Sequence, residues 1–301
     1  MAKRVMSEAA QVSVTGGGVV VRLASNTLSL PVLELPTTLV SWLQEGRLDV
    51  YRRLLEDPAG VDFFQQHLPV LVTRSSGSSF PFNCGNKGIG FLPDEKNLPR
   101  YIDLYRRTIE ATRAMPWRES LTARIAAARS FHEDREAIDY RCLTSIEIFR
   151  KRTFHNLREY PLASLLFTGT SPRYMSFQLN CAVEIIGEPD PRFTFIKLSR
   201  RMFEFDAFHI AQPDFHIGYL FWIAEVIDKT PHRVAFPAWD SGAAGPHPSL
   251  EWDDEALSVL RSLPAWSRPH VKSEIERYGA ERGFCRITVE VVSEARKILR
   301  H

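Results

Sequence analysis

The chain has 301 residues, of which 44% are hydrophobic and 25% are charged, a balance that is typical of globular proteins and excludes extensive disorder. Such a length accommodates one large domain or two ordinary ones. With 38 basic and 36 acidic side chains the formal net charge is only +2, so neither nucleic acid nor an anionic membrane surface is an expected partner.

The N-terminus and the most apolar segment both argue against export and membrane insertion. Lys3 and Arg4 are not followed by the apolar stretch of a secretory signal. The run from Ile217 to Val226 contains Glu225 and reaches about half of the ~20 residues that a transmembrane helix needs. We therefore expect a cytoplasmic protein with no membrane partner.

The first part of the chain predicts a hairpin followed by helices, over residues 12–72. Valines on either side of Gly16–Gly18 are typical of two strands joined by a turn. Apolar residues then recur at helical spacing between Leu39 and Leu55. We interpret the glycine- and serine-rich residues 74–90 as a loop, either a surface connection or the wall of a ligand site that carries Cys84 and Lys87.

Residues 98–157 are expected to be mostly helical. Apolar side chains recur at spacings of three and four, among them Leu143, Ile146 and Phe149. His132 and His155 lie among charged residues in this region. We expect a solvated surface position for both of them rather than a role as metal ligands.

The pattern then changes to a period of two, which is typical of strands. Residues from Met175 to Glu184 alternate, residues 187–191 have turn chemistry, and Phe193–Leu198 reads as the returning antiparallel strand. Further strands are expected at Tyr219–Ile227 and Val234–Phe236. An antiparallel sheet packed with helices gives the α+β fold class.

The domain organisation follows from a change in composition. Proline and glycine accumulate before residue 250, which is typical of a linker. We expect an α+β domain over residues 1–240, a linker over residues 241–249 and a small helical domain over residues 250–301.

The four cysteines lie far apart, at Cys84, Cys142, Cys181 and Cys285. The absence of a C-x-x-C pair excludes a zinc ribbon or a ferredoxin-type cluster. Buried free thiols are the expected state. A second interpretation pairs Cys84 with a distant histidine as a catalytic nucleophile.

Residues 199–222 are the most informative stretch of the first domain for function. Arg200 and Arg201 can bind carboxylates or phosphates, and His209 and His216 can ligate a metal such as iron or move protons. The residues that we expect to hold a cofactor are Arg200, Arg201, Phe205, Phe208, Tyr219, Trp222 and Lys87. The alternative is that the rings are core packing and the arginines anchor ion pairs.

Two enzyme classes are disfavoured by the motifs. The seven-residue separation of His209 and His216 differs from the i, i+4 histidine pair of a helical zinc hydrolase. No G-x-S-x-G motif is present, which disfavours a serine hydrolase of the α/β class.

The C-terminal residues predict three short helices with defined ends. Asp253 and Asp254 can cap the first helix, Val271 and Ile275 mark the second, and Thr288 can cap the third. A set of positions in this segment shares an order and a spacing: Trp252, Pro264, Ile275-Glu276, Tyr278, Ala280, Gly283, Ile287-Thr288, Glu290-Val291 and Ala295-Arg296.

This segment resembles the C-terminal domain of the B subunit of light-independent (dark-operative) protochlorophyllide reductase. In that family the domain follows a nitrogenase-like body that holds an iron–sulfur cluster and helps to enclose a tetrapyrrole. Residues 1–249 have no counterpart of that body, so neither the reaction nor a cluster ligand carries over. The resemblance implies a tetrapyrrole or redox context, and its plainer reading is a reused three-helix packing unit.

Three hypotheses about function follow. The leading one is an oxidoreductase or redox accessory protein whose α+β domain binds haem or another tetrapyrrole, with His209 or His216 as axial ligand or proton donor and the arginine pair on the propionates. The second is a non-catalytic assembly or interaction protein. The third is an enzyme with a mononuclear iron or zinc centre built from histidine and carboxylate. A small-molecule substrate or tetrapyrrole is the expected partner, with a homodimer left open.

Overall fold

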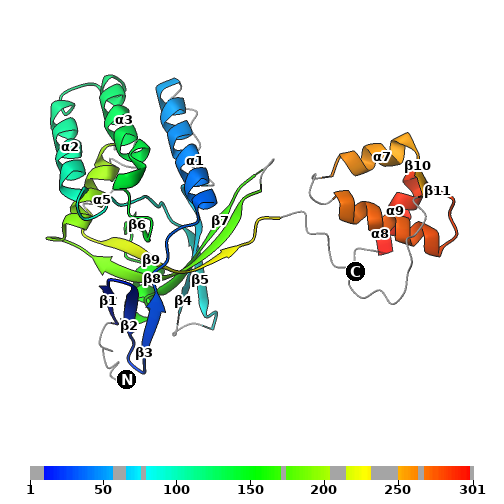
Figure 1. Cartoon of the computed structure of the whole chain (residues 1–301), viewed down its shortest axis with the longest axis horizontal. Coiled ribbons are helices and arrows are strands. Elements are labelled where there is room, and N and C mark those ends of the chain that lie inside the picture. Colours follow the sequence, from blue (N-terminus) through cyan, green and yellow to red (C-terminus); the bar gives the residue numbers. More distant parts are fainter. Residues whose placement is uncertain are drawn as a thin grey trace. The chain divides into compact units, whose positions relative to one another are not determined.

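A computed structural model shows the chain as two compact units, the first ending at Thr230 and the second beginning at Pro231 (Figure 1). The structure describes residues 10–56, 66–75, 79–170, 174–203, 215–231, 250–263 and 268–298. Each unit has a hydrophobic core of its own, and each is described by itself.

The first unit is built on an antiparallel six-stranded sheet with the order β5-β4-β7-β8-β9-β6. Its strands are β4 (Val70–Arg74), β5 (Phe82–Asn86), β6 (Cys142–Ile146), β7 (Leu162–Thr168), β8 (Ser176–Ile186) and β9 (Gly218–Asp228). The strands β5 and β6 are the two edges of this sheet. The chain that follows β5 pairs with residues at β6 and just before it through the bridges Gly90↔Thr144 and Pro93↔Ile138, which brings the two edges together and curls the sheet. Side chains alternate along β7, so that Ala163, Leu165 and Phe167 point into the core.

Helices pack on this sheet and on one another. They are α1 (Thr37–Glu56), α2 (Leu98–Ala111), α3 (Trp117–Glu133), the short η1 (Arg135–Ala137), α4 (Arg152–Glu159) and α5 (Pro191–Arg201). In Figure 1, α1, α2 and α3 stand together at one side of the sheet. Apolar residues seal the contact between α1 and α3, namely Val50, Tyr51, Leu54, Leu121, Ile125 and Ala128.

A smaller antiparallel sheet precedes these elements. It consists of β1 (Gln11–Thr15), β2 (Gly18–Arg22) and β3 (Thr27–Pro31). Val19 and Val21 of its central strand are fully buried in the main core. The Leu33 amide donates to the Ile223 carbonyl at 2.8 Å, which ties the chain after β3 to β9.

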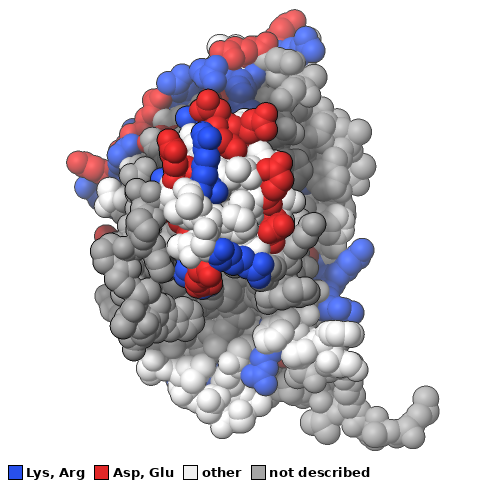
Figure 2. All heavy atoms as spheres, turned by 90° about the vertical axis from the view of Figure 1, so that its right-hand side faces the viewer, with Lys and Arg blue, Asp and Glu red and all other residues white. Residues whose placement is uncertain are grey.

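The second unit holds β10 (Glu251–Trp252), α7 (Asp254–Arg261), α8 (Arg268–Glu281), β11 (Arg286–Ile287) and α9 (Val289–Ile298). Asp253 caps α7 by accepting from the Ala256 amide at 2.7 Å. Gly283 adopts a φ of +74°, which lets the chain turn after α8 toward β11. Figure 2 shows acidic and basic side chains interspersed on the face that it presents. Within the second unit, Arg277 pairs with Glu274 at 2.5 Å and Lys272 with Glu276 at 3.7 Å.

The α+β class predicted from the sequence is confirmed, and most elements fall where the pattern placed them. Three predicted segments were wrong. Phe193–Leu198 lies in α5 rather than in a strand, because Asp190 caps a helix that has Pro191 at its first position. Residues 142–146 form strand β6 instead of helix, and the stretch expected as a loop contains β5.

Two expected features fall outside the described residues: the strand at Val234–Phe236 and the linker at residues 241–249. In the part of the chain that the structure describes, no helix combines the length and the apolar character of a membrane span.

Candidate functional site

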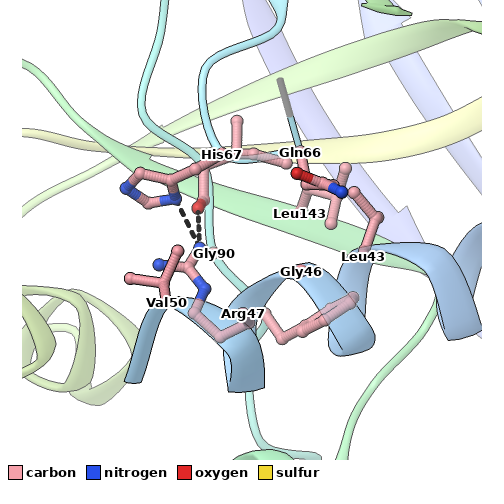
Figure 3. Close-up of a pocket in the computed structure, with 10 residues that line it drawn as sticks. Leu43, Gly46, Arg47, Val50, Gln66, His67, Gly90 and Leu143 are labelled. Atoms are coloured by element: carbon pink, nitrogen blue, oxygen red, sulfur yellow. Dashed lines mark hydrogen bonds between the residues drawn. The ribbon is translucent and has the colours of Figure 1, made fainter. Parts of the chain in front are cut away.

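A pocket opens between α1 and the β6 side of the curled sheet (Figure 3). It encloses about 400 Å³ of space that holds no atoms, including its mouth toward solvent. Its walls are Leu43, Gly46, Arg47 and Val50 of α1, then Gln66, His67, Ile89, Gly90 and Phe91 of the connecting segments, and Leu143 of β6. We call this the α1 pocket.

Helical geometry explains why these α1 residues share one wall. Leu43, Gly46, Arg47 and Val50 follow the spacing i, i+3, i+4, i+7, which places them on one face of a helix. Gly46 is needed here, since a Cβ at that position would lie 2.6 Å from Cδ of Gln66. The missing side chain lets Gln66 lie close against α1 at the pocket.

Arg47 is the charged residue of the pocket, and its guanidinium is held from one side. Nη2 donates to the Ile89 carbonyl at 2.8 Å and to Nδ1 of His67, as the dashed lines in Figure 3 show. None of the ion pairs found within the described ranges involves Arg47. Burial lowers the pKa of Arg47, but the group remains a cation at neutral pH.

His67 is neutral and has a defined tautomer. Its Nδ1 accepts from Arg47, so the ring proton is on Nε2. Burial and, next, the Arg47 cation hold the pKa of His67 well below its ordinary value. The imidazole therefore orients Arg47 without adding a second charge.

His132 lies in the core beside the pocket, and the expectation of a solvated position was wrong for it. Its side chain is 7% exposed and packs among the rings of Tyr51, Phe91 and Phe131 at centroid distances of 5.6, 6.0 and 5.0 Å. Burial and the Arg47 cation lower the pKa of His132 well below its ordinary value. Its Nδ1 has no hydrogen-bond partner among the described residues. His155, in contrast, is exposed on α4 as expected.

A second cluster joins Lys87, Glu147 and Tyr219. Lys87 Nζ lies 2.8 Å from Oε2 of Glu147, and the Tyr219 hydroxyl donates to the same oxygen at 2.7 Å. Oε1 of Glu147 accepts from the amides of Phe149 and Arg150 at 2.9 and 2.8 Å. Every strong acceptor position of this carboxylate is therefore engaged. The cluster is a fixed ion pair with Lys87 over the Tyr219 ring, 5.0 Å from its centroid.

Burial opposes ionisation of Glu147, because its side chain is 4% exposed. Lys87, the Tyr219 hydroxyl and the Arg150 amide outweigh burial and lower the pKa of Glu147. The pKa of Tyr219 is raised by burial and by the Glu147 charge, so its hydroxyl stays a donor.

The α1 pocket and this cluster share one face of the sheet. Leu143 of β6 forms part of the pocket wall, and Ser145 and Glu147 follow at a spacing of two. The Ser145 hydroxyl donates to the Gly88 carbonyl at 2.6 Å, which fixes the segment that leads from Lys87 to Phe91. The segment that carries the lysine thus also lines the pocket.

Of the residues that the sequence singled out, Lys87 and Tyr219 are brought together. Trp222 is 6% exposed and its Nε1 donates to Glu184 at 2.9 Å, so its ring is part of the core. Arg200 lies 4.3 Å from the centroid of the Phe215 ring, and Arg201 is exposed. The core-packing alternative therefore describes Tyr219 and Trp222 well.

The remaining candidates do not converge on one site. His216 is exposed, and its carbonyl oxygen would lie 2.8 Å from a Cβ at Gly187. His209, Phe205 and Phe208 lie outside the described residues. Among the residues that the structure does describe, no three His, Cys, Asp or Glu side chains form a group that could hold a metal ion.

The cysteines divide into two pairs. Cys142 and Cys181 are buried and free, as expected. Cys84 and Cys285 are exposed and free, so burial was the wrong expectation for them. Cys84 lies on β5 opposite Val72, and no ring or hydrogen-bond contact of Cys84 with a histidine is found among the described residues.

Sequence reasoning missed Arg47 and His67. The available signal was that Arg47 is a charged residue on the apolar stripe of its helix, between Leu43 and Val50. Nothing local indicates that His67, twenty positions further along the chain, receives its hydrogen bond.

Comparison with known proteins bears on the second unit. Residues 252–296 match the family model described as Proto-chlorophyllide reductase 57 kD subunit. The B subunit of light-independent protochlorophyllide reductase from Heliobacterium modesticaldum is 33% identical over 60 residues, which cover 20% of this chain and 12% of that protein. Its counterpart from Roseiflexus castenholzii is 38% identical over 48 residues, which cover 16% of this chain and 8% of that protein.

Among solved structures, a protein assigned as a pyridoxamine 5'-phosphate oxidase from Listeria innocua is 9% identical, with a TM-score of 0.31 over 62% of this chain and 98% of that one. An FMN-binding protein from Syntrophomonas wolfei subsp. wolfei is 10% identical, with a TM-score of 0.31 over 63% of this chain and 90% of that one. At these values the likeness says nothing about ligand or reaction. The resemblance predicted for the C-terminal segment is confirmed, and it covers a small fraction of the curated relatives.

Proposed function

We propose that the chain is an oxidoreductase or redox accessory protein that binds a tetrapyrrole through its first unit. The observation that supports this proposal is the match of residues 252–296 to a protochlorophyllide reductase family. The matched relatives act on a tetrapyrrole according to their names, and a module shared with them favours the same class of ligand here.

The side-chain contacts within the first unit restrict the positions at which such a ligand could bind. Tyr219 and Trp222 are engaged with Glu147 and Glu184 in the core, so they do not wall a macrocycle. The proposed binding face is instead the end of α5 and the start of β9, where Arg201 and His216 are exposed. In this arrangement Arg201 would pair with a propionate, and the exposed His216 would lie toward the ring of the ligand.

The described residues do not enclose a haem, so a bound tetrapyrrole would lie on this exposed face rather than in a cavity. The 400 Å³ of the α1 pocket includes open solvent at its mouth, so the enclosed part is far smaller than a macrocycle. The redox chemistry would therefore be that of the bound ligand and not of a metal site formed by the described residues.

The absorption spectrum of the full chain tests the proposal. On addition of haem or protochlorophyllide, we expect a saturable shift of the ligand's absorption bands at one equivalent. Replacement His216→Ala or His209→Ala should weaken binding or change the band position. His155→Ala is the matched control, because His155 is an exposed histidine on α4. A spectrum equal to that of the free ligand, or one that none of the variants changes, contradicts the proposal.

A second function, protein binding, is favoured by three exposed aromatic side chains. Phe80, Phe82 and Phe149 are 80%, 66% and 57% exposed. The Asn83 amide donates to the Thr153 hydroxyl at 3.1 Å, which holds the Phe82 and Phe149 segments near each other. Large apolar side chains exposed on neighbouring segments favour a contact surface.

Sedimentation equilibrium tests this second candidate. We expect self-association of the full chain that the double replacement Phe82→Ser and Phe149→Ser weakens, with Leu55→Ser as the control for a single exposed apolar residue. Equal association of all three proteins contradicts self-association through this surface.

A further inference from the structure

We propose that the α1 pocket is a binding site for an oxyanion, the carboxylate or phosphate group of a small organic molecule. The inference stands on the residues of this pocket and holds whether or not the redox proposal does. Four features of the pocket carry it.

The first feature is a cation for which the described part of the chain supplies no counter-ion. Arg47 is partly buried at the pocket, and no carboxylate pairs with it among the described residues. On the same helix, Asp49 pairs with Arg52 and Arg53 at 2.6 and 3.0 Å. A buried charge without a partner is destabilising, and an oxyanion in the pocket would offset that cost.

The second feature is the orientation of the guanidinium. Nη2 is engaged by the Ile89 carbonyl and by His67, while Nε and Nη1 have no partner in the described ranges. Nε and Nη1 are two of the five N–H donor positions whose fork geometry matches a carboxylate or phosphate. Figure 3 shows the group reaching from α1 to His67, which holds its plane in place.

The third feature is the composition of the walls. Among the described residues no acidic side chain lines the pocket, and the polar side chains beside Arg47 are those of Gln66 and His67. The rest of the lining is apolar, with Leu43, Val50, Ile89, Phe91 and Leu143. A positive group among apolar walls selects an anionic head that carries an apolar body.

The fourth feature is the buried polar atoms beside the pocket. Nδ1 of His132 and Oε1 of Gln44 lack hydrogen-bond partners among the described residues, although both residues are more than nine-tenths buried. Burial and, next, the Arg47 cation lower the pKa values of His67 and His132, and the His132 ring packs against Phe91 of the pocket wall at a centroid distance of 6.0 Å. A bound anion would offset that positive charge.

The test is a set of binding isotherms of the full chain with inorganic phosphate, acetate and butyrate, measured by calorimetry with sodium chloride as the ionic-strength control. We expect saturable binding by the wild type, and a loss of about tenfold or more in affinity for Arg47→Met, the effect of removing charge-assisted hydrogen bonds. Arg47→Lys should keep part of the affinity. Arg52→Met is the matched control on the exposed face of the same helix, and its affinity should stay within about twofold of the wild type.

Comparison of the three ligands distinguishes a phosphate group from a carboxylate as the bound oxyanion. Tighter binding of phosphate assigns a phosphate group, and tighter binding of butyrate than of acetate assigns a carboxylate on an apolar body. Absence of saturable binding by the wild type, or equal affinity of the wild type and Arg47→Met, overturns the proposal.

If Arg47→Met does not fold, the wild type alone decides. The ring resonances of His67 and His132 should then move with saturation during the titration, and unchanged resonances overturn the proposal. The spectrum that tests tetrapyrrole binding is a separate measurement, so one proposal can fail without the other.

Discussion

The replacement Lys87→Met should destabilise the first unit by about 3 kcal/mol. It leaves the Glu147 carboxylate, whose side chain is 4% exposed, without its cation. Breaking a buried ion pair from one side costs about 3–5 kcal/mol. The lower end applies, because the Tyr219 hydroxyl and the two amides still donate to Glu147.

The pH dependence of this loss follows from the pKa of Glu147. In the wild type the folded pKa is below the ordinary value of 4.5, so the cluster's contribution is present above pH 4.5 and is lost as pH falls through the folded pKa. Without Lys87, burial raises the folded pKa, and the variant then loses stability as pH rises. The difference between variant and wild type should therefore grow from pH 4 to pH 7.

The stability of the first unit is measured by urea unfolding, with hydrogen exchange of peptides from β6 and β9 as the readout. These peptides belong to the first unit, so the second unit does not contribute to the signal. Lys197→Met is the control, because its pair with Glu188 is 3.3 Å long with a carboxylate that is 65% exposed, and such pairs contribute about 1 kcal/mol or less. The double replacement Lys87→Met with Glu147→Gln should recover part of the loss. A loss for Lys87→Met no larger than that of the control, or a loss that does not change with pH, refutes this reasoning.

Three further predictions concern the second unit and the thiols. Asp253→Ala should lower the free energy of unfolding of the second unit by about 1 kcal/mol, because the cap of α7 is lost, whereas Asp254→Ala should change it little. Thermal unfolding measures both variants, and equal effects would rule out the cap. Gly279→Ala should destabilise the same unit by about 1–3 kcal/mol, because a Cβ would lie 2.7 Å from Ile287 and 2.9 Å from Leu250, and an unchanged melting temperature would contradict that packing. Cys84 and Cys285 should react with a thiol reagent in the native protein. Cys142 and Cys181 should react only after unfolding, because they are buried and burial raises the pKa values of their thiols. Equal reaction rates of all four thiols in the native protein would contradict the fold.

Local patterns in the sequence predicted most elements of this fold, and the failures have identifiable causes. The alternation along β8 and the helical stripe of α1 are long enough to define a period. Phe193 and Phe195 are spaced like a strand, but the Asp190 cap and Pro191 before them start a helix. The spacing of Leu143 and Ile146 is that of a helix, and the pairing of this segment with β9 makes it a strand instead.

The candidate site was less predictable, because its residues meet only through tertiary structure. Lys87, Glu147 and Tyr219 are separated by 60 and 72 positions along the chain, so no motif connects them. The prediction of Lys87 as a site residue rested on its glycine-rich surroundings, and its partner Glu147 had no signal at all. The C-terminal segment is the opposite case, since its resemblance is carried by local order and spacing.

The most direct test of the proposed function is a titration of the purified full chain with a tetrapyrrole, followed by visible absorption. We predict a saturable spectral shift at one equivalent and protection of peptides around α5 and β9 from hydrogen exchange in the complex. A spectrum that stays that of the free tetrapyrrole, with unchanged exchange throughout the first unit, would contradict the proposal.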